Sequence, residues 1–127
     1  MLLPADNRQW LCLSGTKYQA HHGYSSKLCD FILFWEPRGG SLHVATLELK
    51  SGSFRAGSVG DQLQNGANVA DLLLGAASAK FAPALIHNGI KTQETRKLKS
   101  LRIRLRSASE LIQPIRSGQP TSSIDWG

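Results

Sequence analysis

The fold is decided by the stretch Leu42-His43-Val44-Ala45-Thr46-Leu47-Glu48-Leu49-Lys50, a largely apolar run that ends on two charged side chains. A second apolar run precedes it, Cys29-Asp30-Phe31-Ile32-Leu33-Phe34-Trp35-Glu36, and Pro37-Arg38-Gly39-Gly40-Ser41 between them is typical of a turn. The two runs therefore predict a β-hairpin with strands over about 28–36 and 42–50.

The charged residues of this hairpin are expected to share one face. In an extended strand Glu48 and Lys50 point to the same side and Leu49 to the other. A turn centred on Gly39 places Asp30 opposite Glu48, so that two carboxylates lie about 5 Å apart. Like charges at that separation destabilise a sheet unless a cation lies between them. The pattern predicts a metal site, whereas a turn shifted by one residue would put the two acids on opposite faces.

An acid on one strand and Glu-x-Lys on the next, here Asp30 and Glu48-Leu49-Lys50, resembles the signature of the PD-(D/E)XK nuclease superfamily. The resemblance implies a restriction-endonuclease-like α/β fold, in which a mixed central sheet flanked by helices has the order α-β-β-β-α-β. It also implies that Asp30 and Glu48 bind a divalent metal and that Lys50 positions or activates the attacking water. The backbone carbonyl of Leu49 is expected as a third protein ligand.

The resemblance extends into the next predicted element, a helix over about 59–79. Ser58 and Asp61 are typical of a capping box at its start. The segment Gln62-Leu63-Gln64-Asn65-Gly66 resembles the Q-h-x-x-Y motif of the RecB-like branch, which makes Gln62 a catalytic-site candidate. Gln64 competes for this role, and Gly66 stands where the motif has tyrosine.

The segment before the hairpin departs from the superfamily. Many members carry a glutamate on the first helix of the core, but residues 1–29 contain a single acid, Asp6. His21 and His22 are the nearest candidates to replace it, by binding the metal or by acting on the scissile phosphate. The favoured alternative is a polar loop or helix end. Residues 7–19 are expected to be irregular or helical. The first core strand of the superfamily would have to come from residues 15–24.

Length and composition indicate one domain covering residues 1–127, because 127 residues with 41% apolar side chains suffice for one core. We expect a cytoplasmic protein without a membrane partner, since the sequence contains neither an apolar run of membrane-spanning length nor a secretory leader. Two cysteines, Cys12 and Cys29, fit a reducing compartment and have no zinc-site spacing.

Positive charge is concentrated in residues 91–116, which account for the whole net charge of +6. Within this block Leu101-Arg102-Ile103-Arg104-Leu105-Arg106 alternates, so a strand would bury three apolar side chains and present three arginines. Guanidinium groups match phosphate bidentately, and the block predicts a nucleic-acid contact made by Arg102, Arg104, Arg106 and Lys97. The alternative is a sheet edge kept soluble by charge, with the nucleic-acid surface around Lys17, Arg55 and Lys97 instead.

The remaining elements are predicted more coarsely. Residues 81–87 are expected to form a strand that is followed by a turn at Asn88-Gly89. Residues 107–115 are expected to form one helical turn or a further strand, and 118–127 a loose tail.

Together these features predict a metal-dependent nuclease that hydrolyses phosphodiester bonds. Two carboxylates without a Cys/His cluster favour Mg²⁺ or Mn²⁺ over Zn²⁺. DNA is the favoured substrate, with RNA left open, and so small a chain is expected to act as a homodimer or as the cutting module of a larger assembly. The alternative is a non-catalytic protein with the same fold that binds nucleic acid or another subunit.

Overall fold

The chain forms a mixed α/β fold, as the sequence predicts. The computed structural model describes residues 9–36, 41–106, 108–120 and 123–126. Its elements are β1 (Gln9–Ser14), α1 (Gly15–His22), β2 (Phe31–Glu36), β3 (His43–Lys50), α2 (Ala56–Leu74), β4 (Lys80–His87), α3 (Thr92–Ser100), β5 (Arg102–Leu105), β6 (Ala108–Leu111) and β7 (Gln113–Arg116).

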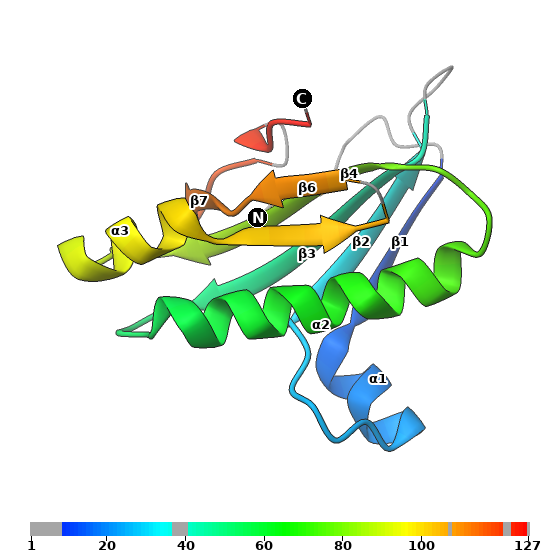
Figure 1. Ribbon diagram of the computed structural model, residues 1–127, viewed down its shortest axis with the longest axis horizontal. Coiled ribbons are helices and arrows are strands. Elements are labelled where there is room, and N and C mark those ends of the chain that lie inside the picture. The colour runs from blue at the N-terminus through cyan, green and yellow to red at the C-terminus, as the bar shows by residue number, and fades with distance from the viewer. Residues whose placement is uncertain (1–8, 37–40, 107, 121–122, 127) are drawn as a thin grey trace.

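Five strands form the central sheet in the order β1-β2-β3-β4-β7, and β5 pairs with β6 separately (Figure 1). The first three strands are antiparallel neighbours, whereas β3, β4 and β7 run parallel to one another. Parallel neighbours need long crossover connections. The helix α2 lies in the first crossover, and α3 with the β5–β6 hairpin lies in the second. The carboxyl ends of β3, β4 and β7 therefore lie side by side at the same end of the sheet.

The β2–β3 hairpin has the register that the sequence predicts. Its pairs run from Phe31 with Leu47 to Trp35 with His43, the register of a turn centred on Gly39; that residue itself lies outside the described part of the chain. One step beyond the Phe31–Leu47 pair, Asp30 faces Glu48. The strand β2 begins only at Phe31, so Asp30 belongs to the preceding loop rather than to the strand predicted from residue 28.

Both faces of the sheet are covered. On one face Ile32, Val44 and Leu85 pack against α2, α3 and β5. On the other face Leu33 and Ala45 belong to a second cluster that is completed by Ile124 and Trp126 near the C-terminus. Every residue of β3 from His43 to Glu48 is consequently buried, as expected of a strand between two covered faces. The residues predicted as a loose tail therefore contribute to the core.

The helix α2 begins and ends earlier than predicted. Ser58 and Asp61 lie inside it and form no capping box, because the N-cap position is Arg55, whose side chain makes no capping hydrogen bond. The main-chain amide of Ala56 instead donates to Oε1 of Glu94 on α3, at 3.3 Å. The cap thus comes from a residue far along the sequence. Within the described residues, none of the helices combines the length and apolar character needed to cross a membrane.

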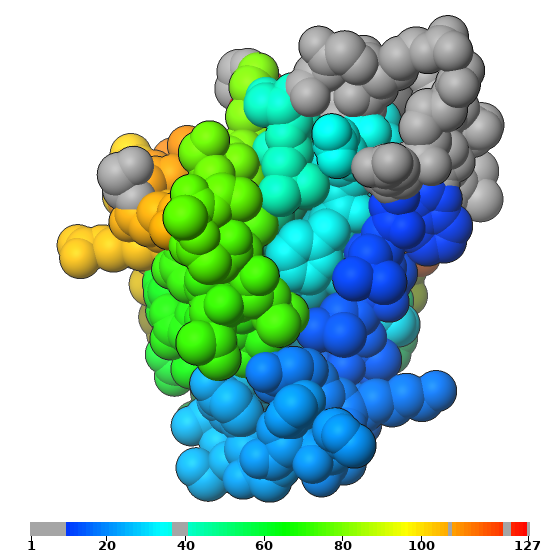
Figure 2. Space-filling model, turned by 90° about the vertical axis from the view of Figure 1, so that its right-hand side faces the viewer, coloured from blue at the N-terminus to red at the C-terminus, as the bar shows by residue number. Residues whose placement is uncertain are grey.

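The N-terminal segment also differs from the prediction. Residues 15–22 form α1 rather than a strand, and the first strand is β1, at one edge of the sheet. Figure 2 shows this edge, with β1 in dark blue at the surface and α1 in lighter blue below it. Trp10 and Leu11 of β1 are 43% and 58% exposed. The run from Trp10 to Leu13 is apolar without alternation, so the period of two that marks a half-buried strand is missing here.

The helix α3 was not predicted from the sequence. Of its nine residues only Leu98 is buried. The apolar repeat that identifies an amphipathic helix is therefore missing. After it, residues 108–116 form the two strands β6 and β7, which agrees with the strand alternative for this segment.

Candidate functional site

The two acids of the predicted site meet at the end of the hairpin. The main-chain amide of Asp30 donates to Oε1 of Glu48 at 3.1 Å, and the main-chain amide of Leu49 donates to Oδ2 of Asp30 at 2.8 Å. Each carboxylate therefore accepts a hydrogen bond from the backbone beside the other acid. This reciprocal pair fixes the two side chains on the sheet face that α2 covers.

Glu48 is an unusual carboxylate because its side chain is only 1% exposed. Burial, and after it the charge and hydrogen bonding of Asp30, raise the pKa of Glu48 to about 7. Lys50 acts in the opposite direction, with Nζ 3.1 Å from Oε2 of Glu48. The predicted side-by-side arrangement of Glu48 and Lys50 is confirmed, and Leu49 points away and is 45% exposed.

The loop that carries Asp30 is held by α1. The main-chain amide of Gly15 donates to the carbonyl oxygen of Asp30 at 2.8 Å. A Cβ atom at residue 15 would lie 1.7 Å from the carbonyl oxygen of Cys29, so only glycine allows this approach. The first residue of α1 thus fixes the backbone on which Asp30 stands.

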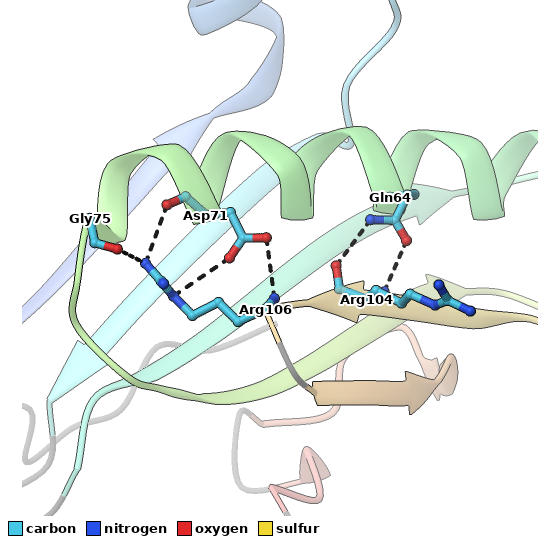
Figure 3. A network of polar contacts seen from close by, with 5 residues as sticks. All are labelled: Gln64, Asp71, Gly75, Arg104 and Arg106. Carbon is cyan, nitrogen blue, oxygen red and sulfur yellow. Dashed lines mark hydrogen bonds and ion pairs between the residues drawn. The ribbon is translucent and has the colours of Figure 1, made fainter.

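Gln62 and Gln64, the two candidates on α2, have different roles. Gln62 is buried and lines a hollow of about 550 Å³ together with Lys50. Gln64 faces β5, where its amide accepts from the main-chain nitrogen of Arg104 at 2.9 Å and donates to the carbonyl oxygen at 3.0 Å (Figure 3). Only Gln62 lies at the predicted site, whereas Gln64 joins β5 to the helix.

Gly66 occupies the tyrosine position of the Q-h-x-x-Y motif because α2 approaches the hairpin closely there. A Cβ atom at this position would lie 2.3 Å from Sγ of Cys29 and 3.4 Å from Cγ2 of Thr46. A larger side chain at residue 66 would therefore overlap Cys29 unless the helix or the Cys29 side chain moved. The departure from the motif therefore has a packing cause in this chain.

The hollow beside Lys50 lies at the carboxyl end of β3, next to the first turns of α2. We call it the Lys50 hollow, and its lining includes Lys27, Lys50, Phe54, Arg55, Asp61 and Gln62. In open α/β sheets, ligands bind outside the carboxyl ends of the strands. The hollow therefore lies where a ligand of this fold is expected, beside the acid pair.

The predicted metal site contains two carboxylates and, within the part of the chain that the structure describes, no larger cluster of ligands. Across the described residues, no group of three or more His, Cys, Asp or Glu side chains could hold a metal ion. A metal at this site would therefore have two protein carboxylates, those of Asp30 and Glu48, rather than three or more side-chain ligands. Mg²⁺ is commonly held by one or two carboxylates while water and substrate phosphates complete its shell. Oxygen donors without Cys or His favour Mg²⁺ or Mn²⁺ over Zn²⁺.

His21 and His22 lie in the last turn of α1 and are exposed. The His22 ring stacks on Tyr18 with a centroid separation of 4.1 Å, and the His21 ring packs edge-on against His22 at 4.9 Å. These contacts agree with the favoured interpretation of the pair as a polar helix end.

The predicted alternation is confirmed within β5, where Ile103 and Leu105 are buried and Arg102 and Arg104 are exposed. The strand ends at Leu105, so Arg106, which is also exposed, lies just beyond it rather than inside it as predicted. The arginines are not equivalent, however. Arg106 binds the carbonyl oxygens of Asp71 and Gly75 at the end of α2, and its Nε lies 3.6 Å from Oδ1 of Asp71 (Figure 3). Arg106 therefore acts as a helix cap, which the expectation of three equal phosphate contacts did not include.

The other predicted phosphate-binding residues, Arg102, Arg104 and Lys97, make fewer contacts than Arg106. Arg102 donates to the carbonyl oxygen of Ser109 at 2.9 Å, and Lys97 lies 3.8 Å from Glu94 while its side chain is 69% exposed. Within the described residues the guanidinium of Arg104 makes no hydrogen bond or ion pair, although its main chain is held by Gln64. Among the three predicted phosphate-binding arginines, Arg104 is thus the one whose guanidinium is open to an external anion.

Sequence reasoning missed two residues of the Lys50 hollow, Lys27 and Phe54. Lys27 was not assigned a role, although it lies three residues before Asp30. Phe54 is the single aromatic residue in the Gly/Ser-rich segment 51–57, which was a signal that the loop does more than connect. The alternative nucleic-acid surface did include Arg55, which lines this hollow.

Comparisons of this chain with family models, curated proteins and solved structures find no match.

Proposed function

We propose that this chain is a metal-dependent nuclease that hydrolyses phosphodiester bonds, with DNA as the favoured substrate. The observation that carries the proposal is the convergence of Asp30, Glu48 and Lys50 at the carboxyl end of β3. A buried carboxylate next to a second carboxylate is costly for a fold to maintain. A function that needs both charges explains why the chain keeps them.

The arrangement of elements supports a restriction-endonuclease-like core. From β1 to β4 the strands and α2 follow the order β-β-β-α-β, with α1 inserted between the first two strands. This agrees with the last five elements of the order that the resemblance to PD-(D/E)XK nucleases implies. The helix expected before the first strand would precede Gln9 and lies outside the described residues.

In this proposal Asp30 and Glu48 hold Mg²⁺ or Mn²⁺, and the carbonyl of Leu49 stays the predicted third ligand. The bound ion would supply a nucleophilic water near neutral pH and would neutralise charge on the phosphate. Lys50 is 25% exposed, so its ammonium group can reach the Lys50 hollow while it contacts Glu48. We assign it the stabilisation of negative charge that develops on the phosphate.

Gln62 has a positioning role in the proposal. Its side chain is 6% exposed and lines the same hollow as Lys50. An amide can donate one hydrogen bond and accept another, which suits the orientation of a water or of the Lys50 ammonium group.

The test is cleavage of labelled DNA by the purified chain with Mg²⁺ or Mn²⁺, and with EDTA as the metal-free control. Glu48→Gln and Lys50→Ala should each lower the rate at least about a hundredfold. Glu110→Gln is the matched control, because Glu110 is an exposed glutamate on β6. Full activity of Glu48→Gln would overturn the proposal.

A second candidate is a protein that binds nucleic acid without cutting it. The reciprocal hydrogen bonds of Asp30 and Glu48 favour this candidate, because they fasten the hairpin without any metal. The two candidates differ in metal dependence. A wild-type chain that binds DNA but neither cleaves it nor gains thermal stability from Mn²⁺ would establish the second.

A further inference from the structure

Two hollows that share Lys27 adjoin the site, one beside Lys50 and the other beside Asp30. The Lys50 hollow is lined by Lys27, Lys50, Phe54 and Arg55. A second one of about 660 Å³, the Tyr24 hollow, is lined by Tyr24, Lys27 and Asp30. A polymeric ligand that occupied both hollows would run past Asp30 and Lys50, and Lys27 would contact it where the two hollows meet.

A third hollow continues this path on the far side of Phe54. It has a volume of about 330 Å³ and shares Ser53 and Phe54 with the Lys50 hollow. We call it the Lys91 hollow. Lysine or arginine side chains thus line all three hollows. Three acids also line them, Asp30, Asp61 and Glu94, and of these Glu94 is engaged by Lys97 and by the amide of Ala56. A polyanion is the ligand whose charge suits such a path.

An aromatic ring lines each of the two hollows that adjoin the site. Tyr24 is 36% exposed, and its ring lies 6.1 Å from that of Tyr18, which packs against the core. The main-chain amide of Tyr24 donates to the carbonyl oxygen of Gln19 at 3.0 Å. Phe54 also packs against the core and lines both neighbouring hollows. Both rings thus offer a partly exposed face beside a hollow.

Cations that follow a backbone, with aromatic side chains between them, are the features by which proteins bind single-stranded nucleic acid. Bases of a duplex are stacked on each other, so their faces are closed to side chains along its length. We propose that the site binds a single-stranded nucleic acid, with bases stacked on Tyr24 and Phe54 and the backbone passing Lys27, Lys50 and Arg55. The inference specifies the substrate of the proposed nuclease and rests on that function.

The test is equilibrium binding measured by fluorescence anisotropy in EDTA, so that no cleavage takes place. The probes are an oligothymidylate, an oligouridylate and a blunt DNA duplex of equal length. The wild-type chain should bind at least one of the single strands about tenfold more tightly than the duplex. Tyr24→Ala and Phe54→Ala should each weaken single-strand binding about tenfold, as expected for the loss of one stacking partner, and should leave duplex binding unchanged.

Two variants separate stacking from folding. Trp10→Ala removes an exposed aromatic ring on β1, outside the three hollows, and should bind all probes as the wild type does. Tyr24→Phe keeps the ring and should also bind as the wild type does. Equal or tighter binding of the duplex would overturn the inference. The same holds if Tyr24→Ala and Phe54→Ala bind single strands as tightly as Trp10→Ala.

The proposed function and this inference fail separately. A chain that shows the predicted single-strand binding but does not cleave DNA or RNA with Mg²⁺ or Mn²⁺ refutes the nuclease and leaves the binding path intact. A chain that cuts duplex DNA faster than single strands refutes the binding path and leaves the nuclease intact.

Discussion

The main-chain amide of Asp30 donates a hydrogen bond of 3.1 Å to Oε1 of Glu48, 18 residues away in the sequence. The main-chain amide of Leu49 in turn donates to Oδ2 of Asp30. The two hydrogen bonds hold both carboxylates at the carboxyl end of β3. The backbone amides compensate part of the negative charge, and Lys50 compensates another part. Burial, and after it the charge of Asp30, outweigh this compensation and raise the pKa of Glu48 to about 7.

Stability should depend on pH through Glu48. Its pKa rises from 4.5 to about 7 on folding, so the folded chain keeps a proton that the unfolded chain loses within this range. Stability therefore falls as the pH increases from about 4.5 to about 7. Glu48→Gln removes this dependence. Urea unfolding at several pH values measures this. Between about pH 4.5 and pH 7 the free energy of unfolding of Glu48→Gln should rise relative to that of the wild type by on the order of 3 kcal/mol. A constant difference between the two proteins would contradict the assignment.

Asp30→Asn should stabilise the metal-free protein above pH 7. The substitution removes the charge that faces Glu48, and its amide oxygen can still accept from the amide of Leu49. The melting temperature should rise without metal, and the gain from Mn²⁺ seen in the wild type should disappear. A variant that melts lower than the wild type and still gains stability from Mn²⁺ would show that Asp30 is purely structural.

The contact of Gly66 with Cys29 can be tested within one helix. Gly66→Ala should lower the free energy of unfolding by about 1–3 kcal/mol, because its Cβ would overlap Sγ of Cys29. Gly57→Ala is the matched control, since a Cβ there meets no atom within 4 Å, and it should be neutral or stabilising by up to about 1 kcal/mol. Adding Cys29→Ala to Gly66→Ala should recover part of the loss. Equal effects at the two glycines would refute the close approach.

Arg104 on β5 and Arg106, which follows the strand, should differ in that one is a surface residue and the other is structural. Arg106→Gln should lower the free energy of unfolding by about 1 kcal/mol, because it removes bonds to the last carbonyls of α2. Arg104→Gln should leave stability within about 0.5 kcal/mol. If Arg104 binds a phosphate, this variant should also flatten the dependence of log K on log salt by about one unit for duplex DNA. An unchanged slope would show that Arg104 only protects the strand edge.

The hairpin and its acid pair could be predicted from the sequence because their information is local. Two apolar runs, a turn and the period of two along a strand determine which residues face each other. The pairing of Phe31 with Leu47 follows from that alone. The same holds for the alternation of Arg102 to Leu105, where buried and exposed side chains follow the pattern of the sequence.

The features that could not be predicted depend on residues distant in the sequence. The cap of α2 comes from Glu94, so local capping rules pointed to Ser58 instead. The role of Arg106 depends on the position of Gly75, and the burial of Ile124 depends on its packing against the sheet face that carries Leu33 and Ala45. The hollow around Phe54 exists because Lys27 and α2 approach it from separate segments.

The most direct test of the metal site is a crystal of the wild-type chain soaked in Mn²⁺ above pH 7, where Glu48 is ionised, with data collected for anomalous scattering. We predict an anomalous peak in direct contact with the carboxylate oxygens of both Asp30 and Glu48. The peak should be absent in Glu48→Gln crystals treated in the same way. Wild-type crystals with no peak at the acid pair, and with the two reciprocal hydrogen bonds unchanged, would contradict the assignment of this site as a metal centre.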